Sequence, residues 1–371
     1  MLTQAVLRYA VERMSMDPPP LDKTRSAVEL RAMAGRTVTA TGIGGLEALR
    51  IFAEVLGPAS ISIDHPRFLS FVPAAPTEAA ILFDLVVGAS SIYGGSWLEG
   101  GGAIYAENEA LRYVSDLAGL PESAGGAFVS GGTAGNLSAL IAARYHWRHR
   151  AGGAHDRTRG LLLTGKGAHS SVASAARAMD ADVVLVPADE QGRLWGAALR
   201  DTVAGLEADD RNRVFAIVAT AGTTNAGVID DLAGIAEVCA ETDVWMHVDG
   251  AYGGAGLAAP SVRDRYRGVE HADSFIVDHT NGCSHRSTVA RSCTAIPTLL
   301  APHILNTPST STCCTVARII PVTIGTPATS PITCRVGPAA CRSGSVWQPT
   351  APRPIATRSR PRSTSPAVGR D

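Results

Sequence analysis

The chain has 371 residues, 45% of them apolar, which suits one large α/β domain with an appendage or two domains and excludes disorder throughout. Its formal net charge of −1 combines two unlike segments. Residues 1–278 contain 23 Lys and Arg against 33 Asp and Glu, a net charge of −10, whereas residues 279–371 contain 10 Arg and one acid, a net charge of +9. The composition therefore divides the chain near residue 278.

No apolar run approaches the roughly 18 to 20 residues that span a bilayer, and the N-terminal sequence lacks the apolar core of a signal peptide. We therefore expect a cytoplasmic protein with no membrane partner. Residues 1–278 contain only Cys239, so no secreted disulfide framework is predicted. The cysteines also lack paired metal-ligand spacing, and no metal site is predicted.

Residues 1–60 are expected to form a helical N-terminal arm, broken at the prolines 18–20, and residues 76–115 a second helical layer interrupted by glycines. Beyond them, short apolar runs alternate with longer amphipathic stretches. Strands are predicted near 126–129, 161–164, 182–186, 214–219, 244–248 and 274–277, and helices near 134–149, 170–179, 196–207 and 230–241. This alternation predicts an α/β fold, a mainly parallel sheet with helices on both faces.

Ligands of such sheets bind at the carboxyl ends of the strands, so the segments that follow the strands are the candidate site. SGGTAGN at 130–136 follows a strand and opens a helix. Its glycines and the helix N-terminus predict a phosphate cradle, to which Thr133 adds a hydroxyl. An ordinary Gly-rich turn is the alternative. The segment has neither GKS/T nor a full GxGxxG, which disfavours a Walker or dinucleotide loop.

Two further segments follow strands. GAHSS at 167–171 contains His169, which is able to present its ring to a flat ligand while the serines cap the next helix; a surface or capping histidine is the alternative. TAGTTNAG at 220–227 contains Thr223 and Thr224, whose hydroxyls suit hydrogen bonds to a ligand, although a turn explains this segment equally well.

HVDGAYGG at 247–254 is the most specific of the four segments. Asp249 ends an apolar strand, where a buried carboxylate requires a partner, and Gly250 and Ala251 leave room for a planar group. A carboxylate opposite a pyridinium nitrogen is what makes pyridoxal phosphate (PLP) an electron sink. A strand-end Asp that caps the next helix is the alternative, but the four segments together favour the cofactor.

With these motifs, residues 40–278 resemble the fold-type I PLP enzymes and, within them, the group II amino-acid decarboxylases, which act on aromatic amino acids, glutamate or diaminobutyrate. HPRFLSFVPA at 65–74 and GLPESAGGAFVSGGTAGNLSALIAAR at 119–144 belong to the same match. The resemblance implies a PLP-binding large domain over 61–278, a homodimer, and decarboxylation of an L-amino acid to an amine and CO2. Another fold-type I lyase, which cleaves C–C or C–S bonds, is the alternative.

The resemblance also implies roles for individual residues of this chain. It places Gly131, Gly132 and Thr133 at the cofactor phosphate, His169 on the cofactor ring as stacking and catalytic residue, Thr224 and Ala251 in contact with the cofactor, Asp249 at the pyridine nitrogen, and His65, Phe68 and Phe71 at the substrate.

The Schiff-base lysine of this family, in the context D/N-P-H-K-W, is missing: the chain reads VDHTNGCSHRS, and its only lysines are Lys23 and Lys166. Adding one base to the codon after Asp278 permits the reading DPHKWLFAPFDCCALLYRDP, which is the family's lysine motif and its next strand. A frameshift after Asp278 therefore explains both the missing lysine and the change in composition.

We therefore expect residues 279–371 to be an out-of-frame, mostly disordered tail, with the C-terminal small domain of the family missing. The chain itself is then inactive or severely impaired, a pseudoenzyme. A basic arm that binds nucleic acid is disfavoured, because Trp347 is the only aromatic residue of this segment. In the N-terminal arm, Leu2, Val6 and Leu7 suit packing on a partner subunit or on the chain's own domain.

Overall fold

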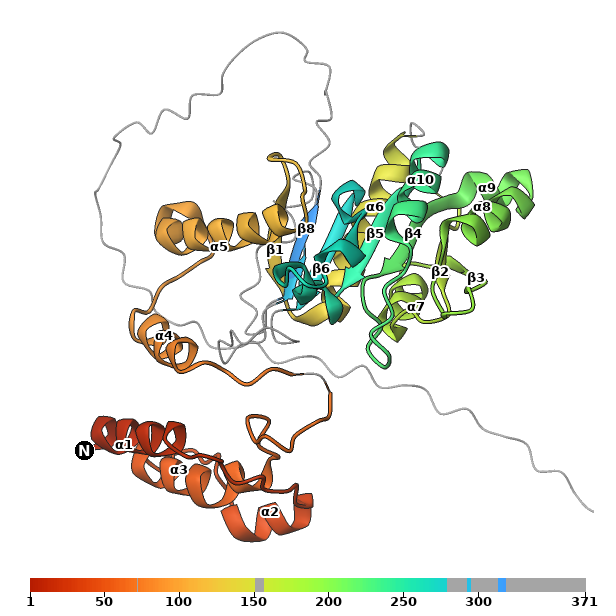
Figure 1. Cartoon of the computed structure of the whole chain (residues 1–371). Helices are drawn as coiled ribbons and strands as arrows, with labels where there is room; N and C mark the ends of the chain where they lie inside the picture. Colours follow the sequence, from red (N-terminus) through yellow and green to blue (C-terminus); the bar gives the residue numbers. More distant parts are fainter. Residues whose placement is uncertain (72, 151–156, 279–291, 295–312, 318–371) are drawn as a thin grey trace, which may run out of the picture. The chain divides into compact units, whose positions relative to one another are not determined.

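The computed structural model describes residues 1–71, 73–150, 157–278, 292–294 and 313–317 (Figure 1). All of them belong to one unit, Met1–Pro321. No helix within these ranges combines the length and the apolar character that a membrane crossing requires.

The N-terminal arm is helical, as the sequence predicts. It contains α1 (Leu2–Met14), α2 (Ala27–Ala34) and α3 (Gly45–Ile51), followed by a π-helical turn (Phe52–Leu56) and a 3-10 turn (Gly57–Ala59). Ser26 caps α2 reciprocally: its Oγ accepts from the Glu29 N–H, and the Glu29 carboxylate accepts from the Ser26 N–H across 2.8 Å. Arg13 of α1 forms an ion pair with Asp64 at 2.8 Å, which ties the first helix to the segment that follows the arm.

The second helical layer consists of α4 (Glu78–Ala89) and α5 (Trp97–Leu117). Of the glycines predicted to interrupt this layer, Gly94 and Gly95 lie between the two helices, whereas Gly100 has a non-helical backbone inside α5. Helix α4 contains no buried residue. Its exposed apolar side chains are Leu82, Phe83, Leu85, Val86 and Val87.

Within the described residues the sheet has eight strands, in the order β1-β7-β8-β6-β5-β4-β2-β3. They are β1 (Gly125–Val129), β2 (Leu161–Gly165), β3 (Asp182–Val186), β4 (Val214–Thr220), β5 (Trp245–Gly250), β6 (Ser274–Asp278), β7 (Ser292–Thr294) and β8 (Cys313–Ala317). The adjacent strands β3, β2, β4, β5 and β6 pair in parallel, in this spatial order. Strands β7 and β8 run antiparallel to both β1 and β6. The predicted mainly parallel sheet is confirmed.

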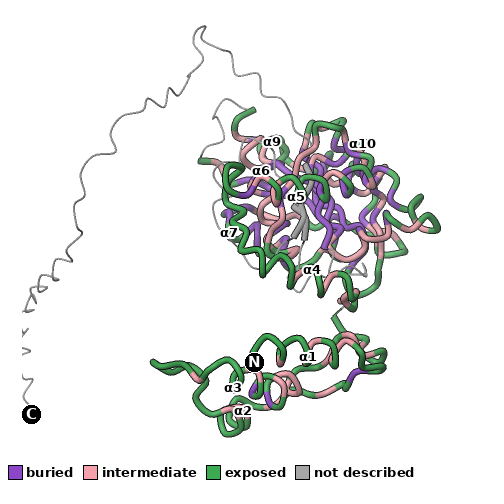
Figure 2. Tube along the Cα trace, turned by 90° about the vertical axis from the view of Figure 1, so that its left-hand side faces the viewer, coloured by how far each residue is buried: buried purple, intermediate pink, exposed green. Residues whose placement is uncertain are grey.

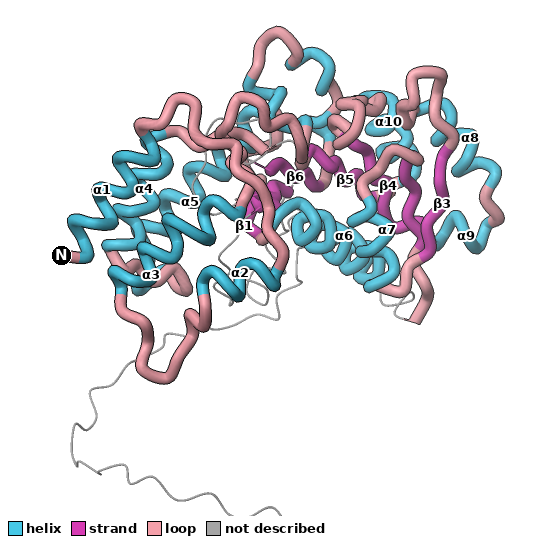
Figure 3. Tube along the Cα trace, turned by 90° about the horizontal axis from the view of Figure 1, so that it is seen from below, coloured by secondary structure: helices cyan, strands magenta, loops and turns pink. Residues whose placement is uncertain are grey.

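Helices cover both faces of the sheet (Figure 3). They are α6 (Gly131–Arg150), α7 (Ser170–Ala178), α8 (Gly196–Gly205), α9 (Ala208–Arg213) and α10 (Leu232–Thr242), and three 3-10 turns follow β5 (Gly253–Ala258, Arg263–Tyr266, Val269–His271). Successive side chains of a strand point to opposite faces, so Leu162 joins the core under α6 and α7, whereas Leu161 and Leu163 join the core under α8 and α10. Buried residues accordingly concentrate along the sheet (Figure 2).

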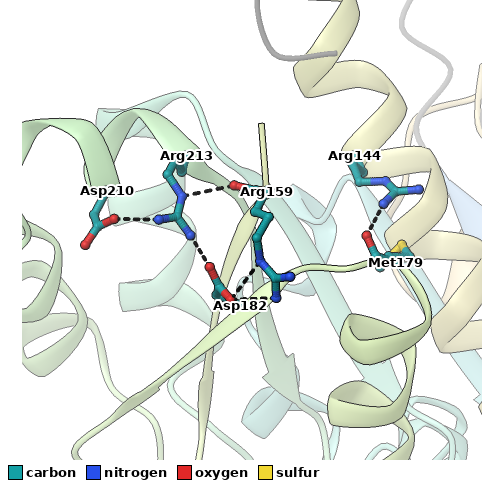
Figure 4. A network of polar contacts seen from close by, with 6 residues as sticks. All are labelled: Arg144, Arg159, Met179, Asp182, Asp210 and Arg213. Carbon is teal, nitrogen blue, oxygen red and sulfur yellow. Dashed lines mark hydrogen bonds and ion pairs between the residues drawn. The ribbon is translucent and has the colours of Figure 1, made fainter. Parts of the chain in front are cut away.

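Polar contacts connect the amino ends of β2, β3 and β4 (Figure 4). Asp182, at the start of β3, pairs with Arg159 at 2.9 Å and with Arg213, whose Nε also donates to the Arg159 carbonyl across 3.0 Å. The hydrogen bond from Arg159 lowers the pKa of the Asp182 carboxyl below its ordinary value. Arg144 of α6 donates to the Met179 carbonyl at the end of α7. These contacts align the strand ends opposite the candidate site.

The segment 279–371, for which the sequence predicts a mostly disordered tail, contains β7 and β8. Both lie between β6 and β1 and pair with the backbone groups of these two strands, a pairing that an extended segment of any origin can make. The rest of that tail lies outside the described residues. Its assignment as out-of-frame sequence stays a prediction.

Candidate active site

A cavity of about 200 Å³ lies at the carboxyl ends of the strands. Seven residues predicted for the site line it: Phe71, Gly132, Thr133, His169, Thr224, Asp249 and Ala251. The other lining residues are Asn136, Gly167, Thr220, Gly222, Thr223, Tyr252 and Asp278. Two larger cavities, of about 560 and 670 Å³, contain none of the predicted residues, so chemistry rather than size marks the candidate site.

Three predicted residues do not line the cavity in the part of the chain that the structure describes: Gly131, His65 and Phe68. Gly131 directly precedes the lining Gly132 and has a φ of +85°, a left-handed conformation that glycine adopts without strain. His65 instead accepts the N–H of Arg67 at its Nδ1 across 3.0 Å, which closes a local turn.

The predicted phosphate cradle is the start of α6. The helix begins at Gly131, so the two glycines belong to its first turn, where backbone N–H groups have no partner within the helix. A Cβ added to Gly132 would lie 2.9 Å from the Cβ of Ala251, so only glycine fits between α6 and the end of β5. Thr133 is exposed next to it.

Asp249 is 4% exposed near the end of β5. Its Oδ2 accepts from Nδ2 of Asn136 across 2.8 Å, and its Oδ1 accepts from the N–H of Ala251 across 3.1 Å. Among the described residues no Lys or Arg pairs with this carboxylate. Only neutral donors therefore compensate its buried charge, and a cationic group in the cavity would complete the compensation.

His169 is the N-cap of α7, which begins at Ser170. Its Nδ1 accepts from the backbone N–H of Ser171 across 3.2 Å and lies 2.8 Å from the Ser171 Oγ. The sequence assigns the cap to the serines, but the histidine itself caps the helix, because its ring nitrogen reaches the first turn. His169 thus combines the two alternatives: it caps a helix and lines the cavity.

The turn after β4 is held by Thr223. Its Oγ1 accepts from the N–H of Val228 across 3.1 Å, whereas Thr224 is exposed in the cavity wall. Gly222 has a φ of +107°, and a Cβ there would lie 2.7 Å from the Cα of Gly253. The turn is therefore a structural element that presents Thr224.

Sequence reasoning missed Asn136, which joins α6 to Asp249. The available signal was its place four residues after Gly132, one helical turn further on the same face, inside the apolar stretch NLSALIAA. A buried amide at such a position requires a partner, but its identity depends on the fold.

These residues fit the noncovalent part of a PLP site. A helix N-terminus suits a phosphate, a carboxylate compensated only by neutral donors suits a pyridinium nitrogen, and an imidazole at the rim suits a flat ring. The lysine that would bind the cofactor covalently is missing from the sequence. Lys23 and Lys166 are exposed, and Lys166 does not belong to the cavity lining although it lies three residues before His169.

A parallel sheet with a Gly-rich helix start and a buried acid at the strand ends is the arrangement in which α/β proteins bind small molecules. Residues 52–295 match the family model described as "Pyridoxal-dependent decarboxylase conserved domain". The chain belongs to this family, whose cofactor is PLP.

The curated relatives are longer proteins than the part that this chain matches. It is 28% identical over 265 residues to the aromatic-L-amino-acid decarboxylase of Bacillus atrophaeus, covering 70% of this chain and 53% of that protein. It is 36% identical over 233 residues to the L-2,4-diaminobutyrate decarboxylase of Rhizobium meliloti (strain 1021), covering 61% and 46%. The chain therefore spans about half the length of the curated relatives it matches.

The fold is also similar to a solved structure, the glutamate decarboxylase domain of diaminobutyrate-pyruvate transaminase and L-2,4-diaminobutyrate decarboxylase from Vibrio parahaemolyticus. The TM-score is 0.68 at 27% identity, and the match covers 78% of this chain and 64% of that chain.

Proposed function

We propose that the site descends from an enzyme that uses PLP to decarboxylate an L-amino acid to an amine and CO2. One observation carries the proposal: Asp249 is buried at the strand ends, and among the described residues its carboxylate accepts hydrogen bonds from the neutral groups of Asn136 and Ala251. A pyridinium nitrogen supplies the cation that this carboxylate lacks. The family to which the chain belongs supports the same chemistry.

PLP, when bound, supplies an electron sink for the charge left by the departing CO2. The start of α6, with Gly131, Gly132 and Thr133, holds the phosphate, and Thr224 contacts the cofactor from the turn after β4. Asp249 holds the ring nitrogen protonated. These roles account for the Gly-rich turn and the buried acid together.

His169 lies on the ring face in this proposal. Because its Nδ1 accepts from the Ser171 N–H, a proton on this ring lies at Nε2, where it would be available to the reacting carbon. Phe71, from the segment 65–71, borders the substrate, and His65 and Phe68 shape that segment.

We further propose that this chain does not turn over. Neither of its two lysines belongs to the cavity lining, so the cofactor has no amine to which it can bind covalently. The altered reading frame after Asp278 explains the loss, and the tail 279–371 is then sequence that was never selected to fold.

Two versions of the gene test these proposals: the present one, and one with a single base added in the codon after Asp278. Each product is purified with PLP and incubated with aromatic L-amino acids, L-glutamate and L-2,4-diaminobutyrate, and both CO2 and amine are measured. We expect both products from the restored chain alone. Cleavage of a C–C or C–S bond by the restored chain without CO2 would identify the alternative lyase.

Two results contradict the proposed inactivity. One is CO2 release by the present chain, together with borohydride fixation of the cofactor on Lys166. The other is a genomic sequence around codon 279 that already aligns base for base with those of relatives, because the frameshift then has no support.

We also propose that the family-type partner is a second copy of the chain. The five large apolar side chains exposed on α4 support this, since contiguous exposed apolar surface on a globular protein usually marks an interface. An isologous contact would bury the same helix of both copies.

A further inference from the structure

A row of buried polar side chains ends at Asp249, and the proposed function uses only Asp249 and the donor of Asn136 from it. Trp245, His247 and Asp249 alternate along β5, so they point to the same face of the sheet, the one that α6 covers. Ser274 of β6 and Asn136 of α6 complete the row. Each of these five residues is at most 4% exposed, so their hydrogen bonds must be satisfied within the protein.

The row begins at Trp245, whose indole N–H only donates, and its Nε1 donates to the Ser274 Oγ across 2.8 Å. The hydroxyl of Ser274 keeps one proton, which we assign to Nδ1 of His247, 2.8 Å away. A neutral His247 then carries its proton on Nε2, which lies 2.8 Å from Oδ1 of Asn136. Burial lowers the pKa of His247 and keeps this ring neutral near pH 7.

The orientation of the Asn136 amide follows. Because its Oδ1 accepts from His247, both hydrogens of Nδ2 point away from β6, one to Oδ2 of Asp249 and one to Oγ of Ser171, each across 2.8 Å. The Ser171 hydroxyl keeps one proton and lies 2.8 Å from Nδ1 of His169, whose single lone pair it shares with the Ser171 N–H. Every donor in the row has one acceptor, and the direction runs from Trp245 to the two residues proposed to contact the cofactor ring.

We propose that Asn136 is a positioning residue, which holds the Asp249 carboxylate directly and the His169 ring through Ser171. The hydrogen bonds that begin at Trp245 orient its amide so that the N–H side faces Asp249. This inference rests on the proposed function, because it gives Asn136 a role toward the pyridine nitrogen of PLP. A reversed amide would place its oxygen against the carboxylate. The observed N–H favours the charged carboxylate that a pyridinium requires.

The probe for the test is pyridoxamine 5′-phosphate with a 15N-labelled ring, which needs no lysine to bind. The full-length chain is compared with Asn136→Leu, which removes all three hydrogen bonds, and with Asn136→Asp, which keeps the shape but replaces the donor by an acceptor. The control is Thr164→Val, because Thr164 is equally buried and donates to the Val218 carbonyl across 3.0 Å outside the row.

We expect the unaltered chain and Thr164→Val to bind the probe with similar dissociation constants and with a ring 15N shift typical of a protonated nitrogen. Both Asn136 variants are expected to bind about 10- to 100-fold more weakly, since a lost hydrogen bond to a charged group weakens binding by roughly that factor. The bound fraction should show a ring nitrogen that has lost its proton at neutral pH. A residue that served packing alone would leave the protonation of the bound ring unchanged.

A second measurement needs neither the probe nor an Asn136 variant. The chain is labelled with 15N-histidine, and the two-bond 15N–1H correlations of His247, assigned with His247→Gln, report its tautomer. We expect a proton on Nε2 in the unaltered chain, and a mixture of both tautomers in Trp245→Phe, in which the donor-only group is gone.

The outcomes separate the two proposals. A probe that does not bind the unaltered chain overturns the proposed function and, with it, the role of Asn136 toward the cofactor. A probe that binds the unaltered chain and the Asn136 variants equally well, with the same ring 15N shift, overturns the positioning role alone. A proton on Nδ1 of His247 in the unaltered chain overturns the direction that we assign to the row.

Discussion

Gly132 and Ala251 meet so closely that a methyl group on Gly132 would lie 2.9 Å from the Cβ of Ala251. The contact joins the first turn of α6 to the end of β5, so it fixes the distance between the predicted phosphate cradle and Asp249. Both parts of the site therefore depend on a position where only a hydrogen atom fits.

The variant Gly132→Ala tests this dependence. We expect it to weaken pyridoxamine 5′-phosphate binding at least tenfold and to lower the free energy of unfolding by about 1 to 3 kcal/mol, because α6 and β5 must separate. The control is Gly192→Ala, outside the site, where a Cβ meets nothing within 4 Å and only the φ of +79° is strained, by about 1 to 2 kcal/mol. Fluorescence titration and urea unfolding measure both effects. Equal affinity of the two variants would contradict the cradle.

His169 allows its two roles to be separated. His169→Phe and His169→Ala both lose the cap on the Ser171 N–H, so each should lower the free energy of unfolding by about 1 kcal/mol. Only His169→Phe retains a flat ring. If His169 stacks on the cofactor, the Phe variant binds pyridoxamine 5′-phosphate within a few-fold of the unaltered chain, while the Ala variant binds about tenfold more weakly. Equal losses of affinity would show that the capping role alone matters.

Asp230 gives a prediction about pH. Its two carboxylate oxygens accept from the N–H groups of Leu194 and Thr220 at 2.8 and 2.7 Å, yet burial raises its pKa from 3.8 to about 6. Between these pH values the folded chain binds more protons than the unfolded chain. The stabilising contribution of this group is therefore fully present below about pH 4 and lost as the pH rises through about 6, a change of roughly 1 to 3 kcal/mol.

The variant Asp230→Asn removes this titration. Its free energy of unfolding, measured by urea denaturation from pH 4 to pH 7, should fall less with rising pH than that of the unaltered chain. Asp201→Asn, at an exposed acid of α8, is the control and should reproduce the unaltered slope. Parallel curves for the unaltered chain and Asp230→Asn would mean that folding does not raise the pKa of Asp230.

The strands were predictable from the sequence because the sheet is covered on both faces. All seven residues of β4, VFAIVAT, are buried, and a continuous apolar run of that length between polar turns indicates a buried strand. The ends of the helices were less predictable. The helix predicted over 196–207 ends at Gly205, where Leu206 turns into an extended conformation and packs against the core under α8 and α10.

The candidate site likewise contains residues that were predictable from the sequence and one that was not. The Gly-rich turn and Asp249 were predictable, because each directly follows a strand and the carboxyl ends of parallel strands meet at one edge. The partner of Asp249 was not: Asn136 lies 113 positions earlier in the chain, and its amide reaches the carboxylate only through the packing of α6 on β5. A hydrogen bond across the fold has no local sequence pattern.

The exposed face of α4 supports a last prediction. Phe83 is 68% exposed in the middle of this apolar helix, so a charge there would lie inside an interface formed with a second copy. We expect Phe83→Glu to shift the mass measured by light scattering from that of a dimer to that of a monomer, because burying an unpaired carboxylate outweighs the apolar contact. Val28→Glu, on the exposed surface of α2, is the matched control and should leave the dimer intact. A dimer that persists in Phe83→Glu would exclude α4 from the interface, and a monomeric unaltered chain would contradict the homodimer itself.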